Sequence, residues 1–149
     1  MLTPPTIVAP ITPPGEGAVG IIRLSGSQST FILDSVFSGR KALSDMASHH
    51  LYRGCLVDDV MVVIMRAPHS YTGEDVVEIH CHGGSQVLRG VLDLLMDGGA
   101  QMAAPGEFTQ RAFVNGRLDL AQAEAVIEVI RARSDRACRI ALDQLDGHL

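Results

Sequence analysis

The sequence has few cysteines, no long apolar run and no basic residue near its start. Cys55, Cys81 and Cys138 lie far apart, so they form neither a paired disulfide framework nor a CxxC metal motif. The longest apolar run, Val60 to Met65, is far too short to cross a bilayer. The first basic residue is Arg23, which does not fit a secretory signal or a transit peptide. We therefore expect a reduced, cytoplasmic protein without a membrane segment.

Positive charge and nucleotide-binding motifs are also scarce. Twelve Lys and Arg residues oppose 17 Asp and Glu, for a net charge of −5, which argues against a protein that mainly coats nucleic acid. No GxxxxGK[ST] motif occurs, and "GEGAVG" precedes an expected strand, so it lacks the context of a dinucleotide fingerprint. This chain alone is expected to bind neither GTP nor NAD.

What is present is enough for one compact domain with an appended element, because 46% of the 149 residues are apolar. Apolar alternation predicts strands, and helical spacing predicts helices with Ser27 as one N-cap. The expected strands cover residues 6–9, 18–26, 49–57, 59–68, 76–82 and 100–105, and the expected helices cover 28–37, 85–97 and 106–116. This order predicts an α+β domain, an α/β sandwich, over residues 1–116.

Residues 117–149 are expected to begin a helical domain. No Gly or Pro interrupts the chain from Leu118 to Leu145, so we predict one helix of about 28 residues and about 42 Å. Its apolar seam should pack on further helices, on a second subunit or on polypeptide outside this sequence. Arg133 and Arg136 fit a solvated face that complements the helix dipole, and contact with tRNA is the alternative.

The stretch "EIHCHGG" holds the densest group of reactive side chains. Glu78, His80 and His82 share one face of the expected strand, while Cys81 points to the other face and is expected in the core. Two imidazoles and a carboxylate can hold a metal, but no other histidine has a linked ligand spacing, which favours structural or hydrogen-bonding histidines. Gly83–Gly84 is expected to make a tight turn, where a Cβ would crowd the site or strain the backbone.

Three charges stand where the pattern predicts apolar residues or loops. They are Arg23, Glu78 and Arg117. One carboxylate with two guanidinium groups suits a ligand that has a flat ring with adjacent N–H donors at one end and carboxylates at the other. The alternative is a structural Arg–Glu ion pair between the sheet and the long helix.

Three long segments carry a family resemblance: "TIVAPITPPGEGAVGIIRLSG", "PHSYTGEDVVEIHCHGG" and "APGEFTQRAFVNGRLDLAQAEAV". Together they resemble the N-terminal part of the tRNA modification GTPase family, MnmE or TrmE, over essentially the whole chain. The resemblance implies a tetrahydrofolate-binding and dimerisation domain, related in fold to the glycine-cleavage aminomethyltransferase, over residues 1–116. It also implies that residues 117–149 begin the helical domain.

The resemblance further implies function and partners. In the family, an inserted Ras-like domain binds GTP with Mg and K. The homodimer works with the flavin-dependent MnmG to build a carboxymethylaminomethyl-type group on the wobble uridine of certain tRNAs. The one-carbon donor is a 5-formyltetrahydrofolate-type folate, and the family's folate contacts fall on Arg23, Glu78 and Arg117. No residue is expected to be catalytic.

The 149 residues contain no GTPase domain, so we do not expect this chain alone to hydrolyse GTP or modify tRNA. Two other functions remain open. One is a pure dimerisation or assembly module without folate binding. The other is a stand-alone folate-dependent one-carbon transferase, although the sequence shows no evident nucleophile or general base.

Overall fold

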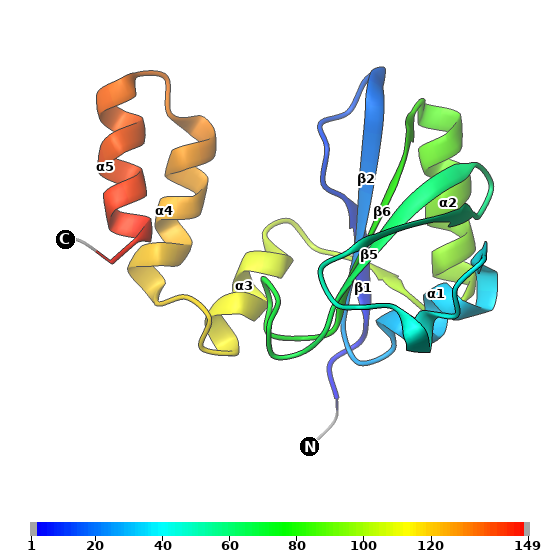
Figure 1. Ribbon diagram of the computed structural model, residues 1–149. Coiled ribbons are helices and arrows are strands. Elements are labelled where there is room, and N and C mark those ends of the chain that lie inside the picture. The colour runs from blue at the N-terminus through cyan, green and yellow to red at the C-terminus, as the bar shows by residue number, and fades with distance from the viewer. Residues whose placement is uncertain (1–2, 148–149) are drawn as a thin grey trace. The chain divides into compact units, whose positions relative to one another are not determined.

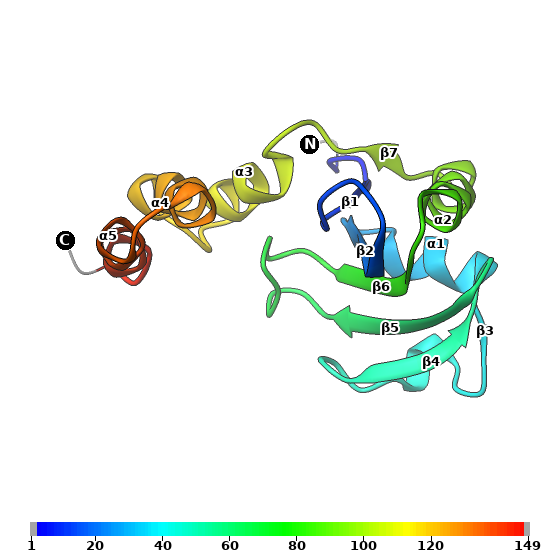
Figure 2. The same cartoon turned by 90° about the horizontal axis from the view of Figure 1, so that it is seen from above.

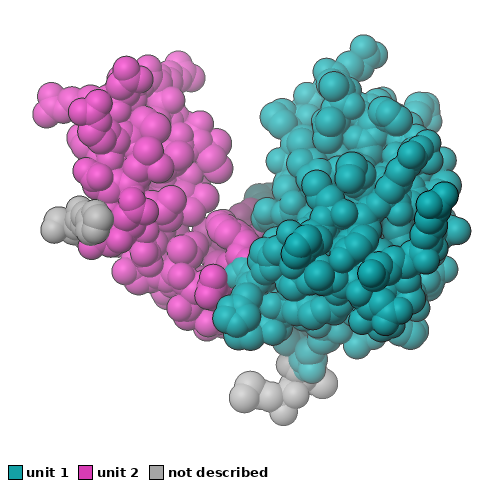
Figure 3. Space-filling model, viewed as in Figure 1, with its two compact units in different colours: residues 1–70, 74–105 teal, residues 71–73, 106–149 magenta. Residues whose placement is uncertain are grey.

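The computed structural model describes residues 3–147, and the chain divides into two compact units (Figure 3). The sheet unit comprises residues 1–70 and 74–105, and the helical unit comprises residues 71–73 and 106–149. The expected boundary after residue 116 differs from this division by one helix, Glu107–Val114. The assignment of functions to residues 1–116 and 117–149 stays a prediction.

The sheet unit is built on a seven-stranded sheet with the order β3-β4-β5-β6-β2-β1-β7 (Figures 1 and 2). All neighbouring strands are antiparallel except β1 and β7, which are parallel. The strands are β1 (Ile7–Pro10), β2 (Gly17–Ser25), β3 (Ser38–Gly39), β4 (Leu51–Cys55), β5 (Asp59–Met65), β6 (Val76–Gly83) and β7 (Gln101–Met102). The predicted α+β class is confirmed.

Two helices cover one face of this sheet, α1 (Ser29–Val36) and α2 (Ser85–Asp97) (Figure 2). The core lies between them and the sheet, because every second residue of the central strands points to the helices. It includes Ile22 and Leu24 of β2, Val60, Val62 and Ile64 of β5, Val77, Ile79 and Cys81 of β6, and Val91 and Leu95 of α2. A short 3-10 turn, Leu43–Asp45, adds Leu43 to the same core.

The opposite face of the sheet carries the alternate residues of the same strands, and we call it the open face. Among the described residues of the sheet unit, no helix covers it (Figure 2). Val19 lies on this face and is 54% exposed, and Met61 is 41% exposed. A register shift between Gly17 and Val19 near the start of β2 accompanies this exposure.

The start of α1 differs from expectation. Ser27 is not the N-cap: Gln28 occupies that position and makes no side-chain capping bond. Thr6 fixes the turn instead, because its Oγ1 accepts the backbone N–H of Gln28 at 3.0 Å. Gly26, at φ +144°, approaches Thr6 so closely that a Cβ would lie 2.7 Å from the Thr6 Cα, so this turn requires glycine.

The helical unit corrects the prediction of one long helix. It contains α3 (Glu107–Val114), α4 (Leu120–Arg131) and α5 (Asp135–Leu145), and α4 and α5 form a hairpin (Figure 1). The chain becomes extended at Ala132, and Ser134 caps α5 by accepting the N–H of Ala137 at 3.1 Å.

The hairpin forms because a single helix has nothing of its own to cover its apolar seam, whereas two antiparallel helices cover part of it. Ala125 of α4 and Ala141 of α5 are buried. Two amide side chains join the helices: Gln122 Nε2 donates to Leu145 O at 2.7 Å, and Gln144 Nε2 donates to Ala121 O at 3.0 Å.

Over residues 3–147, no helix combines the length and the apolar character that a membrane span requires.

Candidate functional site

An arginine–glutamate pair stands at the centre of the open face. Arg23 of β2 and Glu78 of β6 are direct partners in the antiparallel register, so their side chains leave the sheet side by side. The Nε and one terminal nitrogen of Arg23 both donate to Glu78 Oε2, at 3.1 and 2.9 Å. The two side chains are 18% and 17% exposed, and such shielding from water strengthens a charge-assisted hydrogen bond.

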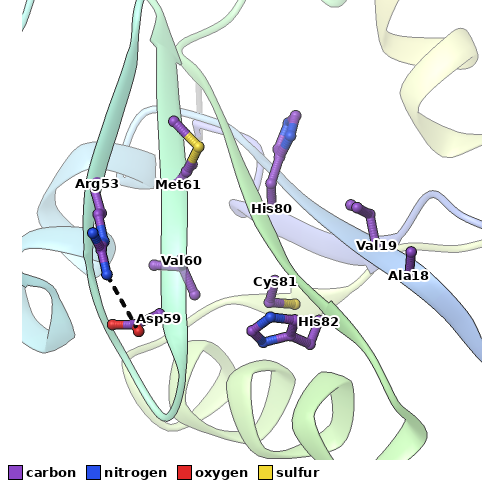
Figure 4. Close-up of a pocket in the computed structure, with 9 residues that line it drawn as sticks. All are labelled: Ala18, Val19, Arg53, Asp59, Val60, Met61, His80, Cys81 and His82. Carbon is purple, nitrogen blue, oxygen red and sulfur yellow. Dashed lines mark ion pairs between the residues drawn. The ribbon is translucent and has the colours of Figure 1, made fainter.

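His80 follows on the same face of β6, opposite Met61 of β5 and Ile21 of β2 in the register, and Figure 4 shows it with Met61 on one side and Val19 on the other. Its Nε2 lies 3.6 Å from Glu78 Oε1, the carboxylate oxygen that Arg23 does not contact in these bonds. That distance exceeds a hydrogen bond. His80 Nε2 is buried and has no hydrogen-bond partner within residues 3–147.

Beside His80 the open face is hollowed. The hollow has a volume of about 430 Å³, within the usual size range of small-molecule sites. Its lining, drawn in Figure 4, consists of Ala18, Val19, Arg53, Asp59, Val60, Met61, His80, Cys81 and His82. Arg53 and Asp59 approach to 3.6 Å at its rim, but both are largely exposed, so this ion pair adds little stability.

His82 is held by a residue that the sequence analysis did not single out. Asp58 Oδ2, in the turn between β4 and β5, accepts the backbone N–H of His82 at 3.1 Å and contacts its Nδ1 at 2.6 Å. The hydrogen bond from the His82 backbone is the main cause that lowers the pKa of Asp58 below its ordinary value, and burial opposes it. Asp58 therefore links the end of β6 to the β4–β5 turn through these hydrogen bonds.

These contacts engage two of the three residues that a metal site on this strand would need. Glu78 is engaged by Arg23, His82 by Asp58, and the rings of His80 and His82 point in different directions (Figure 4). The described part of the chain contains no group of three or more His, Cys, Asp or Glu residues arranged to hold a metal ion. The arrangement suits hydrogen bonding to an organic ligand better than coordination.

Cys81 lies on the helix side of β6, as predicted. It is 4% exposed, and its Sγ contacts the Gly20 carbonyl oxygen at 3.4 Å. Burial raises the pKa of the Cys81 thiol, and the negative charge of Asp58 raises it further. The thiol therefore stays protonated at neutral pH and is a poor nucleophile.

The two glycines after His82 have different roles. A Cβ at Gly83 would collide with the backbone carbonyl of Gly17 on β2, whereas a Cβ at Gly84 would meet nothing within 4 Å. Neither residue has a positive φ. The interpretation that a Cβ would crowd the structure therefore holds for Gly83, because of close approach between strands, and not for Gly84.

Arg117, the third predicted contact, belongs to the helical unit. It follows Gly116, which has φ +76°, and its backbone N–H donates to Ala112 O at 2.8 Å. Its side chain is exposed and runs past Gly73 within the same unit. Of the three predicted site residues, the sheet unit brings together Arg23 and Glu78.

Comparison with known proteins places the chain in a family. The family model described as "GTP-binding protein TrmE N-terminus" matches residues 6–117. Three curated relatives bear the name tRNA modification GTPase MnmE. The protein of Syntrophotalea carbinolica is 54% identical over 100% of this chain, that of Enterococcus faecalis 53% over 97%, and that of Moorella thermoacetica 56% over 97%.

The chain spans about a third of the length of these relatives, between 33% and 34%. It aligns along nearly its whole length, and the matched residues 6–117 include Arg23, Glu78 and Arg117. The chain thus belongs to the TrmE N-terminal family and corresponds to an N-terminal region of the tRNA modification GTPases.

Proposed function

We propose that this chain binds a 5-formyltetrahydrofolate-type one-carbon donor on its open face, as part of a tRNA modification GTPase. The observation that carries the proposal is the Arg23–Glu78 pair. Arg23 engages Oε2 of Glu78, and Oε1 lies 3.6 Å from Nε2 of His80, a residue that lines the hollow. A carboxylate oxygen held in this way is a fixed acceptor for the N–H donors of a flat heterocycle.

The residues present fit such a ligand. Glu78 would accept hydrogen bonds from the amino-substituted pterin ring, and Arg23 would hold the carboxylate in a fixed orientation. Val19 and Met61 would give the ring apolar contact. Arg117, an exposed residue, would bind the carboxylates of the folate tail. When bound, the folate would supply the one-carbon unit, and the chain's own residues would bind and orient it.

The remaining functions belong to a longer protein in this proposal. A GTPase domain that binds GTP with Mg and K, the flavin-dependent partner MnmG, and tRNA would act together with this region to modify the wobble uridine. We propose that this region also makes the homodimer. Other exposed apolar side chains of the sheet unit, Phe31, Leu51 and Val57, support self-association.

Calorimetry with 5-formyltetrahydrofolate tests the binding. We expect the wild-type chain to bind, and Glu78→Ala to lose about 1 to 3 kcal/mol or more of binding free energy. Glu78→Gln keeps the shape without the charge and should lose part of this energy. Glu16→Ala, at an exposed carboxylate of the sheet unit, is the matched control and should bind as the wild type does.

Two outcomes would contradict the proposal. Undiminished binding by Glu78→Ala would place the folate elsewhere. A folded dimer in sedimentation velocity that binds no folate would instead favour the assembly module.

A further inference from the structure

His80 lies beside the Arg23–Glu78 pair, and a contribution to folding stability does not explain why this position is a histidine. Its neighbours across the sheet are Ile21 of β2 and Met61 of β5, and an apolar side chain would fit among them. The structure instead holds a polar ring whose Nε2 is buried with no hydrogen-bond partner in residues 3–147. A buried polar atom without a partner is destabilising, and such atoms in native proteins call for an explanation.

The polar atom that could pair with His80 Nε2 is Glu78 Oε1, which lies 3.6 Å away. Arg23 holds the other oxygen of that carboxylate, so Oε1 has little freedom to turn toward the histidine. When the imidazole carries its proton on Nδ1, Nε2 and Oε1 are two acceptors side by side. Two acceptors do not bond to each other, but together they match two adjacent N–H donors.

The surroundings favour a flat ring as the source of these donors. Val19 and Met61 flank His80 with exposed apolar surface (Figure 4), and the adjoining hollow of about 430 Å³ has room for a heterocycle. The side chain of His80 is 29% exposed, so a ligand meets this side chain from the open face, and a rotation of the imidazole then brings the buried Nε2 to the ligand.

We propose that His80 is a specificity-determining ligand contact. Its Nε2 accepts one N–H of an amino-substituted heteroaromatic ring while Glu78 Oε1 accepts the neighbouring one. The inference rests on the proposed folate function and deepens it, because it assigns recognition of the ring's amino edge to two residues of β6 rather than to Glu78 alone.

The test measures ligand affinity and protein stability in the same variants. His80→Leu should weaken binding of 5-formyltetrahydrofolate about five- to tenfold, as expected for one lost neutral hydrogen bond. His80→Gln, whose amide reaches near the position of Nε2, should retain most of the affinity. His69→Leu, the same change at an exposed loop histidine, is the matched control and should leave affinity unchanged.

Stability separates this role from a structural one. His80→Leu should unfold at the same temperature as the wild type or higher, because it removes an unpaired buried nitrogen. A folate analogue that lacks the ring amino group should bind the wild type about tenfold more weakly than the parent folate. The His80→Leu variant should bind the parent folate and this analogue with nearly equal affinity.

The outcomes distinguish the two proposals. If the wild type binds folate and His80→Leu binds equally well, this inference is overturned and the proposed function stands. If His80→Leu and His80→Gln lose the same affinity, or if His80→Leu loses stability, the histidine acts by shape or packing and the inference is also overturned. If the wild type does not bind, the proposed function fails and the inference fails with it.

Discussion

The sheet unit and the helical unit differ in what they bury. The largest fully buried side chains, such as Ile22, Leu24, Ile64, Ile79 and Leu95, all belong to the sheet unit. The helical unit buries the small side chains of Thr72, Ala112, Ala125 and Ala141 and the large side chain of Arg111. It leaves Ile127, Ile130 and Ile140 from 48% to 77% exposed. The sheet unit is therefore held by long-range apolar packing, and the helical unit depends more on local signals such as caps.

The largest expected effect comes from the sheet core. Ile79→Ala should lower the free energy of unfolding by about 2 to 5 kcal/mol, because it leaves a cavity among fully buried side chains. Ile127→Ala, the same change at a half-exposed position of α4, should cost less than about 1 kcal/mol. Urea denaturation followed by circular dichroism measures both, and equal losses would break the comparison between the units.

A smaller effect is expected where β2 and β6 approach most closely. Gly83→Ala should destabilise the protein by about 1 to 3 kcal/mol, because the new methyl group meets the Gly17 carbonyl. Gly84→Ala should be nearly neutral, since the space around it is open. Differential scanning calorimetry compares the two variants, and an equal drop in both would show that turn geometry matters more than strand packing.

The helical unit should respond to the loss of a cap. Asp119 Oδ1 accepts the N–H of Gln122 at 2.7 Å, and Gln122 Oε1 accepts the N–H of Asp119 at 2.9 Å. Asp119→Ala should cost about 1 kcal/mol and speed amide exchange in α4 while leaving β6 protected. Glu124→Ala, at an exposed interior position of the same helix, is the control. Equal exchange in both variants would contradict a role for the capping box.

The smallest expected effect concerns how the stability of the sheet unit falls at acid pH. The pKa of Asp58 is lowered in the folded protein from the ordinary value of 3.8, so its contribution to stability is present above 3.8. That contribution is lost as the pH falls through the lowered pKa. Asp58→Asn should make the unfolding temperature depend less steeply on pH in this acid range.

The control for this titration is Asp59→Asn, at the largely exposed neighbouring carboxylate, which should keep the steepness of the wild type. If Asp58→Asn titrates as the wild type does, the link to His82 contributes no measurable stability.

Local pattern was sufficient to predict much of the sheet unit. The alternation in "VVEIHCH" placed Glu78, His80 and His82 on one face and Cys81 in the core, because side chains alternate along any strand. The register that sets Arg23 opposite Glu78 was not predictable in this way. It joins residues 55 positions apart, and such pairing depends on the strand order of the whole sheet.

The prediction of a single helix from Leu118 to Leu145 was wrong, because the absence of Gly and Pro does not by itself make a helix continuous. Ser134 followed by Asp135 is a helix-start signal. The apolar residues continue through this point, but the chain ends one helix and starts another here, because the second helix can then pack on the first. The role of Asp58 was also not predictable from local pattern. Its side chain accepts a hydrogen bond from β6, which begins 18 residues later at Val76.

The division of the chain has a consequence for any attempt to dissect it. Residues 71–73, which lie between β5 and β6, belong to the helical unit: Thr72 O accepts the side-chain N–H of Asn115 at 2.8 Å, and the Tyr71 hydroxyl lies 2.8 Å from Thr109 Oγ1. A polypeptide that starts at Gly106 would lose both partners, and one that stops at Pro105 would keep a loop whose partners are gone. No single cut between Pro105 and Gly106 leaves both units with all their contacts, so the two units have to be expressed and engineered as one piece.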